Sequence, residues 1–323
     1  MTAPIGVLVM AYGTASGPED IERYYTDIRG GRPPTPEHLE ELKARYVAIG
    51  NRFPLAGITR QQAEGIEREL NATADGETFR AYVGMKHSPP FIPETVDRMR
   101  ADGIERAVGI AMAPHWSGMS VETYHERIRK ATGEGPPAFA FVRSFHDHPG
   151  FVAFLAGRVA HALGTLGPAE RERAAVIFSA HSLPVRTLED GSLRCKSCTA
   201  CEDSCRYADG LRETADLVAA ELGLPHRAIA WQSAGRTADP WWGPPIEDVV
   251  AELAAAGHPA VVVCSAGFVA DHLETLYDLD VELRREAEEA GIHFVRTQMP
   301  NADPGFVRVL AQVVREVVRE HLR

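Results

Sequence analysis

The sequence of 323 residues has none of the features that would place it in a membrane or on nucleic acid. It lacks a run of about 18 or more apolar residues, the length that a transmembrane helix needs. Its first residues lack the basic segment and cleavage site of a signal peptide. Its formal net charge is −11, whereas nucleic-acid-binding proteins gather cationic side chains against phosphate. We therefore expect a cytoplasmic monomer with no transmembrane segment and no nucleic-acid partner.

Glycine-rich nucleotide motifs are also missing. Neither G-x-G-x-x-G nor G-x-x-x-x-G-K-[ST] follows an apolar strand segment, so the sequence predicts no dinucleotide or ATP site. What remains is an ordinary globular composition, with 45% hydrophobic and 24% charged residues. The chain is long enough for two domains with substantial cores.

Short apolar segments alternate with longer amphipathic ones along the whole chain. Continuous apolar strands separated by helices predict parallel sheets that are covered on both faces. The pattern restarts near residue 150, so we predict an α/β fold of two doubly wound domains with a cleft between them. The predicted units are an N-terminal domain over residues 1–150, a C-terminal domain over 151–300, and a final helix over 301–323 that packs back on the scaffold.

The expected elements follow from this alternation. Strands are expected at Ile5–Ala11, Phe79–Gly84, Ala107–Met112, Ala138–Val142, Ala174–Phe178, His226–Trp231, Ala260–Cys264 and His293–Arg296. Helices are expected near Glu19–Arg29, Pro36–Ala48, Arg60–Asn71, Ile92–Ala101, Val121–Ala131, Phe151–Leu163, Ala208–Glu221, Pro245–Ala255, Ala270–Ala290 and Pro304–Leu322.

Ligands of open α/β sheets bind outside the carboxyl ends of the strands. His181 follows one such strand and precedes Ser-Leu-Pro, which disfavours a helix. An imidazole held there is well placed to act as a base near neutral pH. The alternative is a loop histidine that bonds its own backbone.

Acidic residues recur four apart in the segment ADHLETLYDLDVE. On a helix, Glu274, Asp278 and Glu282 would share one face. Like charges at this spacing cost a helix a few tenths of a kcal/mol per pair, so the pattern favours either a path for a hydrated cation or a solvated acidic face. Nearby, Trp231 opens a stiff aromatic segment, WQSAGRTADPWWGPP, which could wall a flat ligand site or pack on the core.

Four of the five cysteines lie within 11 consecutive residues: Cys195, Cys198, Cys201 and Cys205. Their spacing, C-x2-C-x2-C-x3-C, lets four thiolates converge on one inorganic centre and is similar to that of bacterial iron–sulfur proteins. The same sulfurs could hold a structural Zn²⁺, or form disulfides. The fifth, Cys264, lies in an apolar strand segment and is expected to be buried packing.

The chain also carries long motifs that together identify a family. They are VMAYGT (Val9–Thr14), DIERYYTDIR (Asp20–Arg29), LKARYVAIG (Leu42–Gly50), GMKHSPPFI (Gly84–Ile92), APHWSGMSVETY (Ala113–Tyr124), SAHSLP (Ser179–Pro184), WQSAGRTADPWWGP (Trp231–Pro244), GFVADHLETLYDLDVE (Gly267–Glu282) and QMPNADPGF (Gln298–Phe306). On these motifs, nearly end to end, the chain resembles the ferrochelatases, particularly the monomeric bacterial type that metallates coproporphyrin III.

The resemblance implies two Rossmann-like domains with a porphyrin between them. It implies that Fe²⁺ is inserted into the porphyrin, most simply coproporphyrin III to give coprohaem, in haem biosynthesis. Protoporphyrin IX, another tetrapyrrole, and a non-catalytic haem or iron sensor are the alternatives. His181 and Glu274 would be catalytic and would face the pyrrole nitrogens and the substrate Fe²⁺ from one side. Asp278 and Glu282 would form an outer metal path.

The same resemblance extends to the porphyrin contacts and the cysteine loop. The residues it implies at the porphyrin are Tyr12 on the face opposite His181, Lys86 and His87 in a neighbouring loop, Arg29, Arg45 and Tyr124 at the propionates, and Trp231 from the aromatic segment. Cluster-bearing members of the family favour [2Fe–2S] for the cysteine loop, whereas spacing alone suits [4Fe–4S] or zinc equally. Gly30 stands where a second arginine often follows the first, and Phe53 where a small polar residue is common, which weakens the propionate assignment.

Overall fold

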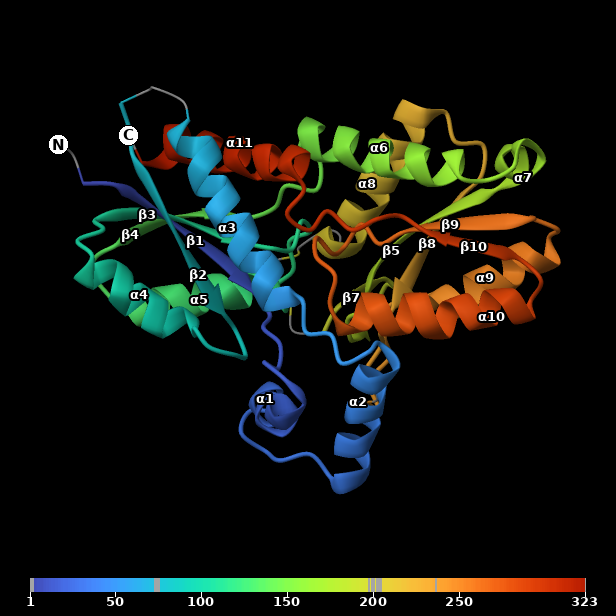
Figure 1. The fold of residues 1–323 in the computed structure, drawn as a ribbon, viewed down its shortest axis with the longest axis horizontal. Helices are drawn as coiled ribbons and strands as arrows, with labels where there is room; N and C mark the ends of the chain where they lie inside the picture. Colours follow the sequence, from blue (N-terminus) through green and yellow to red (C-terminus); the bar gives the residue numbers. More distant parts are fainter. Residues whose placement is uncertain are drawn as a thin grey trace.

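The computed structural model describes residues 3–72, 76–196, 198, 201, 205–235 and 237–322. Two four-stranded parallel sheets dominate it (Figure 1). The first has the strand order β2-β1-β3-β4, and the second has the order β10-β9-β5-β8. The strands are β1 (Ile5–Ala11), β2 (Phe79–Met85), β3 (Arg106–Ala111), β4 (Ala138–Val142), β5 (Ala175–His181), β8 (Arg227–Gln232), β9 (Ala260–Cys264) and β10 (His293–Arg296).

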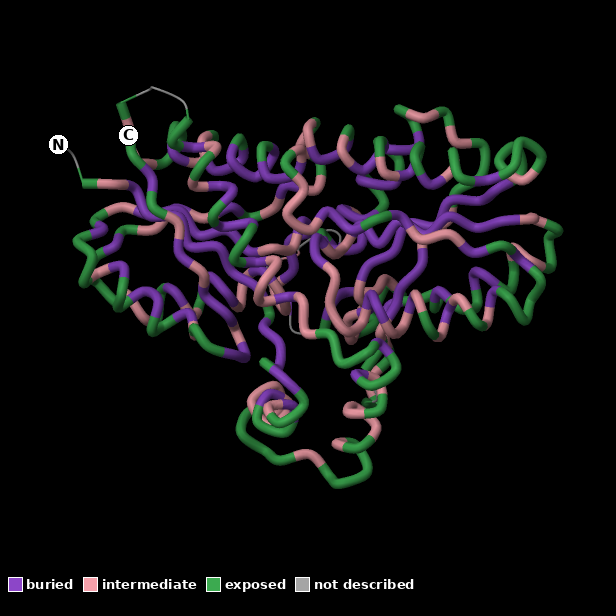
Figure 2. The backbone as a smooth tube through the Cα atoms, viewed as in Figure 1, coloured by how far each residue is buried: buried purple, intermediate pink, exposed green. Residues whose placement is uncertain are grey.

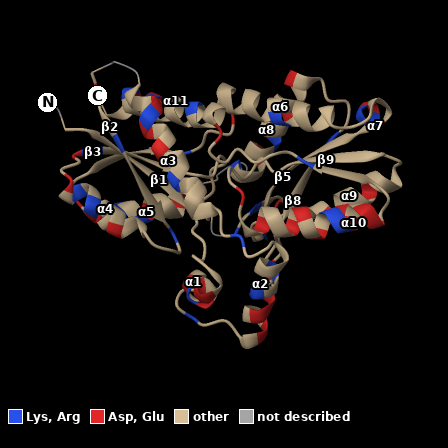
Figure 3. Ribbon diagram, viewed as in Figure 1, with Lys and Arg blue, Asp and Glu red and all other residues tan. Residues whose placement is uncertain are grey.

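Each of these strands coincides with an apolar segment of the sequence, and together they confirm the predicted α/β class. All seven residues of β1 are buried, as expected for a parallel strand covered on both faces. Figure 2 shows the same burial along the central strands of both sheets. Charged residues of both signs lie on outer helices such as α10 (Figure 3). Among the described residues, no helix is long and apolar enough to cross a bilayer.

Helices cover both faces of each sheet. Their bounds are α1 (Ile21–Ile28), α2 (Pro36–Ala48), α3 (Leu55–Asn71), α4 (Ile92–Ala101), α5 (Val121–Thr132), α6 (Pro149–Gly164), α7 (Pro168–Arg173), α8 (Arg206–Leu222), α9 (Ile246–Ala255), α10 (Arg284–Glu289) and α11 (Pro304–His321), with a 3-10 turn at Pro18–Asp20. On the first sheet, α3 and α11 cover one face, and α4 and α5 cover the other (Figure 1). On the second sheet, α6 and α8 lie opposite α9 and α10. The last helix of the chain therefore packs on the first sheet.

Four features differ from the sequence-based expectation. The short helix α7 (Pro168–Arg173) lies outside every predicted helix. The predicted helix over Ala270–Ala290 is a π-helix, η2 (Thr275–Leu283), followed by the short α10. An antiparallel pair, β6 (Val185–Thr187) and β7 (Leu193–Cys195), was not expected because three-residue strands carry almost no periodic pattern. The strand expected to end at Phe178 continues to His181, so this histidine is the last residue of β5.

The helices α1 and α2 project from the first sheet and reach the second half of the molecule (Figure 1). A small apolar cluster joins Tyr24 and Tyr46 of these helices to Leu276 of η2. The acidic π-helix is therefore held against a segment that lies more than 200 residues earlier in the chain.

Candidate active site

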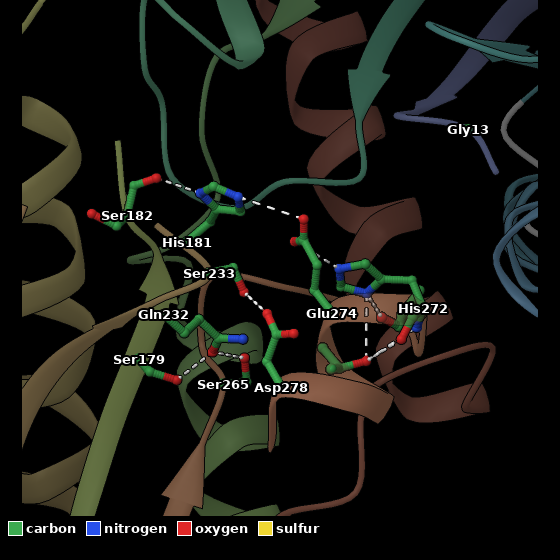
Figure 4. Close-up of polar contacts among 12 residues, drawn as sticks. Gly13, Ser179, His181, Ser182, Gln232, Ser233, Ser265, His272, Glu274 and Asp278 are labelled. Atoms are coloured by element: carbon green, nitrogen blue, oxygen red, sulfur yellow. Dashed lines mark hydrogen bonds and ion pairs between the residues drawn. The ribbon is translucent and has the colours of Figure 1, made fainter. Parts of the chain in front are cut away.

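The centre of the site is a histidine–glutamate pair at the carboxyl end of the second sheet (Figure 4). His181 ends β5, and Glu274 immediately precedes η2. The Nε2 atom of His181 lies 3.6 Å from Oε1 of Glu274. Both side chains remain partly exposed, at 30% and 36%, so a ligand can reach them.

Electrostatics stabilises the charged form of both groups. Burial alone would lower the pKa of His181, but the charge of Glu274 and hydrogen bonds to Glu274 and Ser182 raise it above the usual 6.5. Burial alone would raise the pKa of Glu274, but His181 and His272 hold it well below the usual 4.5. Near pH 6 the two therefore form an imidazolium–carboxylate pair.

Backbone contacts orient the imidazole of His181. Its Nδ1 makes a short contact with the carbonyl oxygen of Ser182, so the Nδ1–H donates and Nε2 points toward Glu274 (Figure 4). The sequence also allowed a histidine that only bonds its own backbone. His181 makes such a backbone contact through Nδ1, while Nε2 faces Glu274. The remaining oxygen of Glu274 lies 3.4 Å from Nε2 of His272, whose Nδ1 lies 3.0 Å from the carbonyl of Ala270.

A buried polar network fixes the strand ends beneath the pair. The Oε1 atom of Gln232 accepts hydrogen bonds from Ser179 at 2.8 Å and from Ser265 at 3.0 Å. Gln232 is only 2% exposed. These bonds connect β5, β8 and the loop after β9 at their carboxyl ends, which is where an open parallel sheet places its ligand.

The loop after β9 approaches β5 so closely that only glycine fits. A Cβ on Gly267 would lie 2.4 Å from Cβ of Ala180. The amide of Gly267 donates to the carbonyl of Ser179 at 3.0 Å. Gly267 therefore sets the distance between His181 and the segment that carries Glu274.

The carboxylates of η2 continue away from Glu274. The i→i+5 bonds of a π-helix give slightly more than four residues per turn, so side chains four apart lie close to one face. Asp278 makes a short hydrogen bond with Ser233 and lies 3.4 Å from Nη1 of Arg45. Burial, and then the charge of Glu274, raise the pKa of Asp278 to about 6. Glu282 is half-buried one step further on.

Two other acidic residues of this region do not join the row of carboxylates. Arg296 binds Asp280 at 2.7 Å and Asp271 at 3.2 Å. These ion pairs neutralise the two carboxylates and leave Glu274, Asp278 and Glu282 as the aligned set.

The first sheet contributes an aromatic and cationic group. Tyr12 follows β1, and its ring centroid lies 4.6 Å from that of His87. Lys86 places Nζ 5.7 Å from the Tyr12 ring and 5.5 Å from the Tyr124 ring. Burial and the neighbouring Arg127 lower the pKa of Lys86 to about 8. Asp27, which sequence reasoning did not single out, lies 2.6 Å from Nδ1 of His87.

The predicted porphyrin contacts thus fall into two groups. Tyr12, Lys86, His87 and Tyr124 gather at the carboxyl ends of the first sheet. Arg29 ends α1, and its Nε is buried without a hydrogen-bond partner among the described residues. Arg45 faces Asp278 instead and stacks over Tyr277, with 5.0 Å between its Cζ and the ring centroid.

Trp231 is buried among aromatic side chains. It is only 3% exposed and lies between Tyr207 and Trp242, with ring centroids 5.5 Å and 5.7 Å away. Its ring packs the aromatic segment onto the core, and the contact between Trp231 and a porphyrin stays a prediction.

The four clustered cysteines are free thiols arranged in two pairs. The Sγ atoms of Cys195 and Cys205 lie 3.3 Å apart, and those of Cys198 and Cys201 lie 2.9 Å apart. Both distances exceed the S–S bond length of about 2.05 Å, which excludes the disulfide alternative here. Cys264 is a fifth free thiol, buried in β9 as expected, and burial raises its pKa to about 12.

This donor set suits a centre that binds two sulfurs at each of two metal ions. Tetrahedral zinc would hold all four sulfurs about 3.8 Å from one another. Within the described residues, the group with three or more donor atoms mutually within 4.8 Å is His146, Asp147 and Glu213, not the cysteines. Beside Cys195, the buried indole N–H of Trp242 is directed at the sulfur and favours its thiolate form, the form that binds a metal ion.

Solved structures with a similar fold include two sirohydrochlorin chelatase structures. The sirohydrochlorin chelatase SirB from Bacillus subtilis subspecies spizizenii, in complex with cobalt, has a TM-score of 0.56 at 10% identity, over 99% of this chain and 97% of that chain. SirB from Bacillus subtilis with Fe³⁺ has a TM-score of 0.59 at 12% identity, over 98% of each chain. At such identities the likeness concerns the fold alone, and it defines a chelatase-type fold.

Sequence relationships specify the family. The ferrochelatase family model matches residues 4–318, and the chain belongs to the ferrochelatase family. It is 45% identical over 312 residues to the coproporphyrin III ferrochelatase of Bacillus subtilis strain 168, covering 96% of both chains. It is 44% identical over 311 residues to that of Geobacillus kaustophilus, covering 96% of this chain and 94% of the relative.

Proposed function

We propose that this protein inserts Fe²⁺ into coproporphyrin III to give coprohaem in haem biosynthesis. The observation that carries the proposal is the His181–Glu274 pair at the carboxyl end of the second sheet. The substrate follows from the relatives, which are named coproporphyrin III ferrochelatases and match nearly the whole chain.

Metal insertion requires a proton acceptor more than any other group. The free-base porphyrin loses two N–H protons as Fe²⁺ takes their place, and the iron stays ferrous. Nε2 of His181 is directed toward Glu274 and can accept a pyrrole proton once the imidazolium has released its own. Glu274 and His272 then offer the next positions for that proton.

The aligned carboxylates can bring the ion to this pair. Fe²⁺ must shed water before it binds the pyrrole nitrogens, and carboxylate oxygens can replace that water step by step. Glu282, Asp278 and Glu274 succeed one another along η2 toward His181. On the other side, Tyr12 and Lys86, which lie against each other, would cover the second face of the macrocycle.

An assay with Fe²⁺ and each porphyrin tests the proposal. Coproporphyrin III has four propionates and protoporphyrin IX has two, so the former needs more cationic contacts. We expect a kcat/KM at least about tenfold higher with coproporphyrin III, the ratio that one charge-assisted hydrogen bond supplies. Equal values, or a preference for protoporphyrin IX, would contradict the substrate assignment. Tight haem binding without turnover would indicate a sensor instead.

We further propose that Cys195, Cys198, Cys201 and Cys205 hold a [2Fe–2S] cluster. The two sulfur pairs, and the buried indole N–H of Trp242 that favours the Cys195 thiolate, support this assignment. The cluster has no electron-transfer task in the reaction and would supply a rigid cross-link within the loop. Iron and acid-labile sulfide analysis of protein purified without oxygen should give two of each per chain. Bound zinc without sulfide would contradict the cluster. Cytoplasmic location and the monomeric state remain predictions.

A further inference from the structure

One hydrogen bond joins the start of α8 to the catalytic histidine. The hydroxyl of Tyr207 donates to the carbonyl oxygen of His181 at 2.8 Å. Tyr207 is 7% exposed, and its ring is packed on Trp231. The phenol contacts the backbone of His181 and not its imidazole, so any effect of Tyr207 on catalysis passes through His181.

The accepting carbonyl is adjacent to the one that orients the imidazole. The ring of His181 donates from Nδ1 to the carbonyl of Ser182, the next residue. Ser182 is itself held on both sides, because its amide donates to Gln232 at 2.7 Å and its hydroxyl donates to Trp242 at 2.8 Å. The peptide that follows His181 contains the carbonyl bound by Tyr207 and the amide bound by Gln232, so a rotation of this peptide would displace Ser182 and, with it, the carbonyl that orients the ring.

The other end of this connection is the cysteine loop. Cys205 immediately precedes α8, two residues before Tyr207. Cys195 pairs with Val185 across β6 and β7, and the amide of Lys196 donates to the carbonyl of Pro184 at 2.8 Å. Both members of this sulfur pair are therefore anchored close to His181. Cys195 is anchored through Pro184 and Val185. Cys205 is anchored through Tyr207.

We propose that Tyr207 is a positioning residue that couples occupancy of the four-cysteine site to the orientation of the His181 imidazole. A metal centre that binds Cys195 and Cys205 fixes the first turn of α8, and with it the bond from Tyr207 to His181. Loss of the centre releases that turn and slows metal insertion, with little change in porphyrin affinity. This inference rests on the proposed iron insertion and on the proposed cluster.

The test uses Tyr207→Phe in the full-length, cluster-bearing protein, because this change removes only the hydroxyl and keeps the packing on Trp231. We expect unchanged cluster absorption, an unchanged KM for coproporphyrin III, and a kcat about three- to tenfold lower, the effect of one hydrogen bond. Tyr82→Phe is the matched control. It removes the hydroxyl that donates to Asp102 at 2.9 Å beside the first sheet, and it should leave kcat unchanged.

A second measurement reads the histidine directly. The nitrogen-15 chemical shift of the His181 ring should differ between cluster-bearing and chelator-stripped wild-type protein, and should differ little between the two forms of Tyr207→Phe. Stripping should lower kcat in the wild type and have little further effect in the variant, because both changes break the same connection.

Three results would overturn the coupling. The first is a wild-type kcat in Tyr207→Phe. The second is an equal fold-loss of kcat in wild type and variant when a chelator removes the cluster. The third is a nitrogen-15 shift of the His181 ring that cluster removal leaves unchanged in the wild type. Purified protein without iron and sulfide would overturn both the cluster and the coupling. An iron–sulfur protein that metallates no porphyrin would overturn the proposed function alone, because the ring-shift comparison needs no turnover.

Discussion

Nε2 of His181 and Oε1 of Glu274 lie 3.6 Å apart, although one residue ends a strand and the other begins a π-helix 93 residues later. The pair is held by Gly267 on one side and by the hydrogen bonds of Ser182 and His272 on the other. Its geometry makes the protonation of the imidazole depend on the carboxylate, and this dependence can be measured.

Glu274→Gln removes the negative charge that raises the pKa of His181. The acidic limb of the kcat/KM profile should therefore move to lower pH, since the neutral imidazole forms more easily without its partner. The plateau should fall by about 10²-fold or more, because the proton acceptor loses its relay. If the acidic limb of the Glu274→Gln profile stays at the wild-type pH, the charge of Glu274 does not control the protonation of His181. Glu288→Gln, at an exposed position of α10, is the control.

The same variant should change stability in a defined pH window. The raised pKa of His181 adds stability below its unfolded value near 6.5, and this is lost as pH rises through the folded value. The lowered pKa of Glu274 adds stability above 4.5, and this is lost as pH falls through the folded value. The difference in melting temperature between wild type and Glu274→Gln should thus be largest between pH 4.5 and 6.5.

Asp278→Asn tests the carboxylate path on η2. The pKa of Asp278 is raised to about 6, so the carboxylate is mostly charged at pH 7 and mostly neutral at pH 5. We expect KM for Fe²⁺ to rise about tenfold at pH 7, since one nearby charge is worth roughly 1–4 kcal/mol, and to change little at pH 5. KM for the porphyrin should stay constant. A rise in KM for the porphyrin alone would contradict the proposed path of carboxylates for Fe²⁺. Glu64→Gln on α3 serves as control.

Arg29→Ala tests recognition of the propionates. Arg29 follows α1 and remains partly exposed, so its guanidinium group can donate to a substrate carboxylate. We expect KM for coproporphyrin III to rise about tenfold, the effect of losing one charge-assisted hydrogen bond, with KM for Fe²⁺ unchanged. Arg60→Ala, an exposed arginine of α3, should change neither value. If Arg29→Ala behaves like this control, Arg29 does not bind substrate.

Gly267→Ala tests the close approach behind the pair. The new methyl would lie 2.4 Å from Cβ of Ala180, so the loop or β5 must move. We expect a loss of about 1–3 kcal/mol in the free energy of unfolding, as for other overpacked sites, together with slower metal insertion. Gly157→Ala on α6 is the matched control, because nothing lies within 4 Å of its new methyl. That change should stabilise the protein by about 0.5–1 kcal/mol. Equal melting temperatures for the two variants would contradict the packing argument.

Sequence patterns predicted the elements that depend on local hydrophobicity. The eight sheet strands were predictable because buried parallel strands are continuous apolar runs. His181 was predictable as a strand-end residue, and Glu274 as part of an acidic row. The π-helix was not, because its apolar spacing is close to that of an α-helix and only the hydrogen bonds distinguish them.

Tertiary packing determined the features that the sequence did not show. Arg45 and Asp278 are 233 positions apart, and no local pattern indicates that they meet. Trp231 is buried because Tyr207 and Trp242 close over it, and neither neighbour follows from the spacing of the aromatic segment. The bond from Tyr207 to His181 has the same origin.

The most direct test of the account is single-turnover iron insertion by His181→Ala. The variant should bind coproporphyrin III with wild-type affinity and insert Fe²⁺ roughly 10²–10⁴-fold more slowly, the usual effect of losing a general base. His161→Ala, an exposed histidine of α6, should insert iron at the wild-type rate. A near-wild-type rate in His181→Ala would show that the pyrrole protons leave by another route.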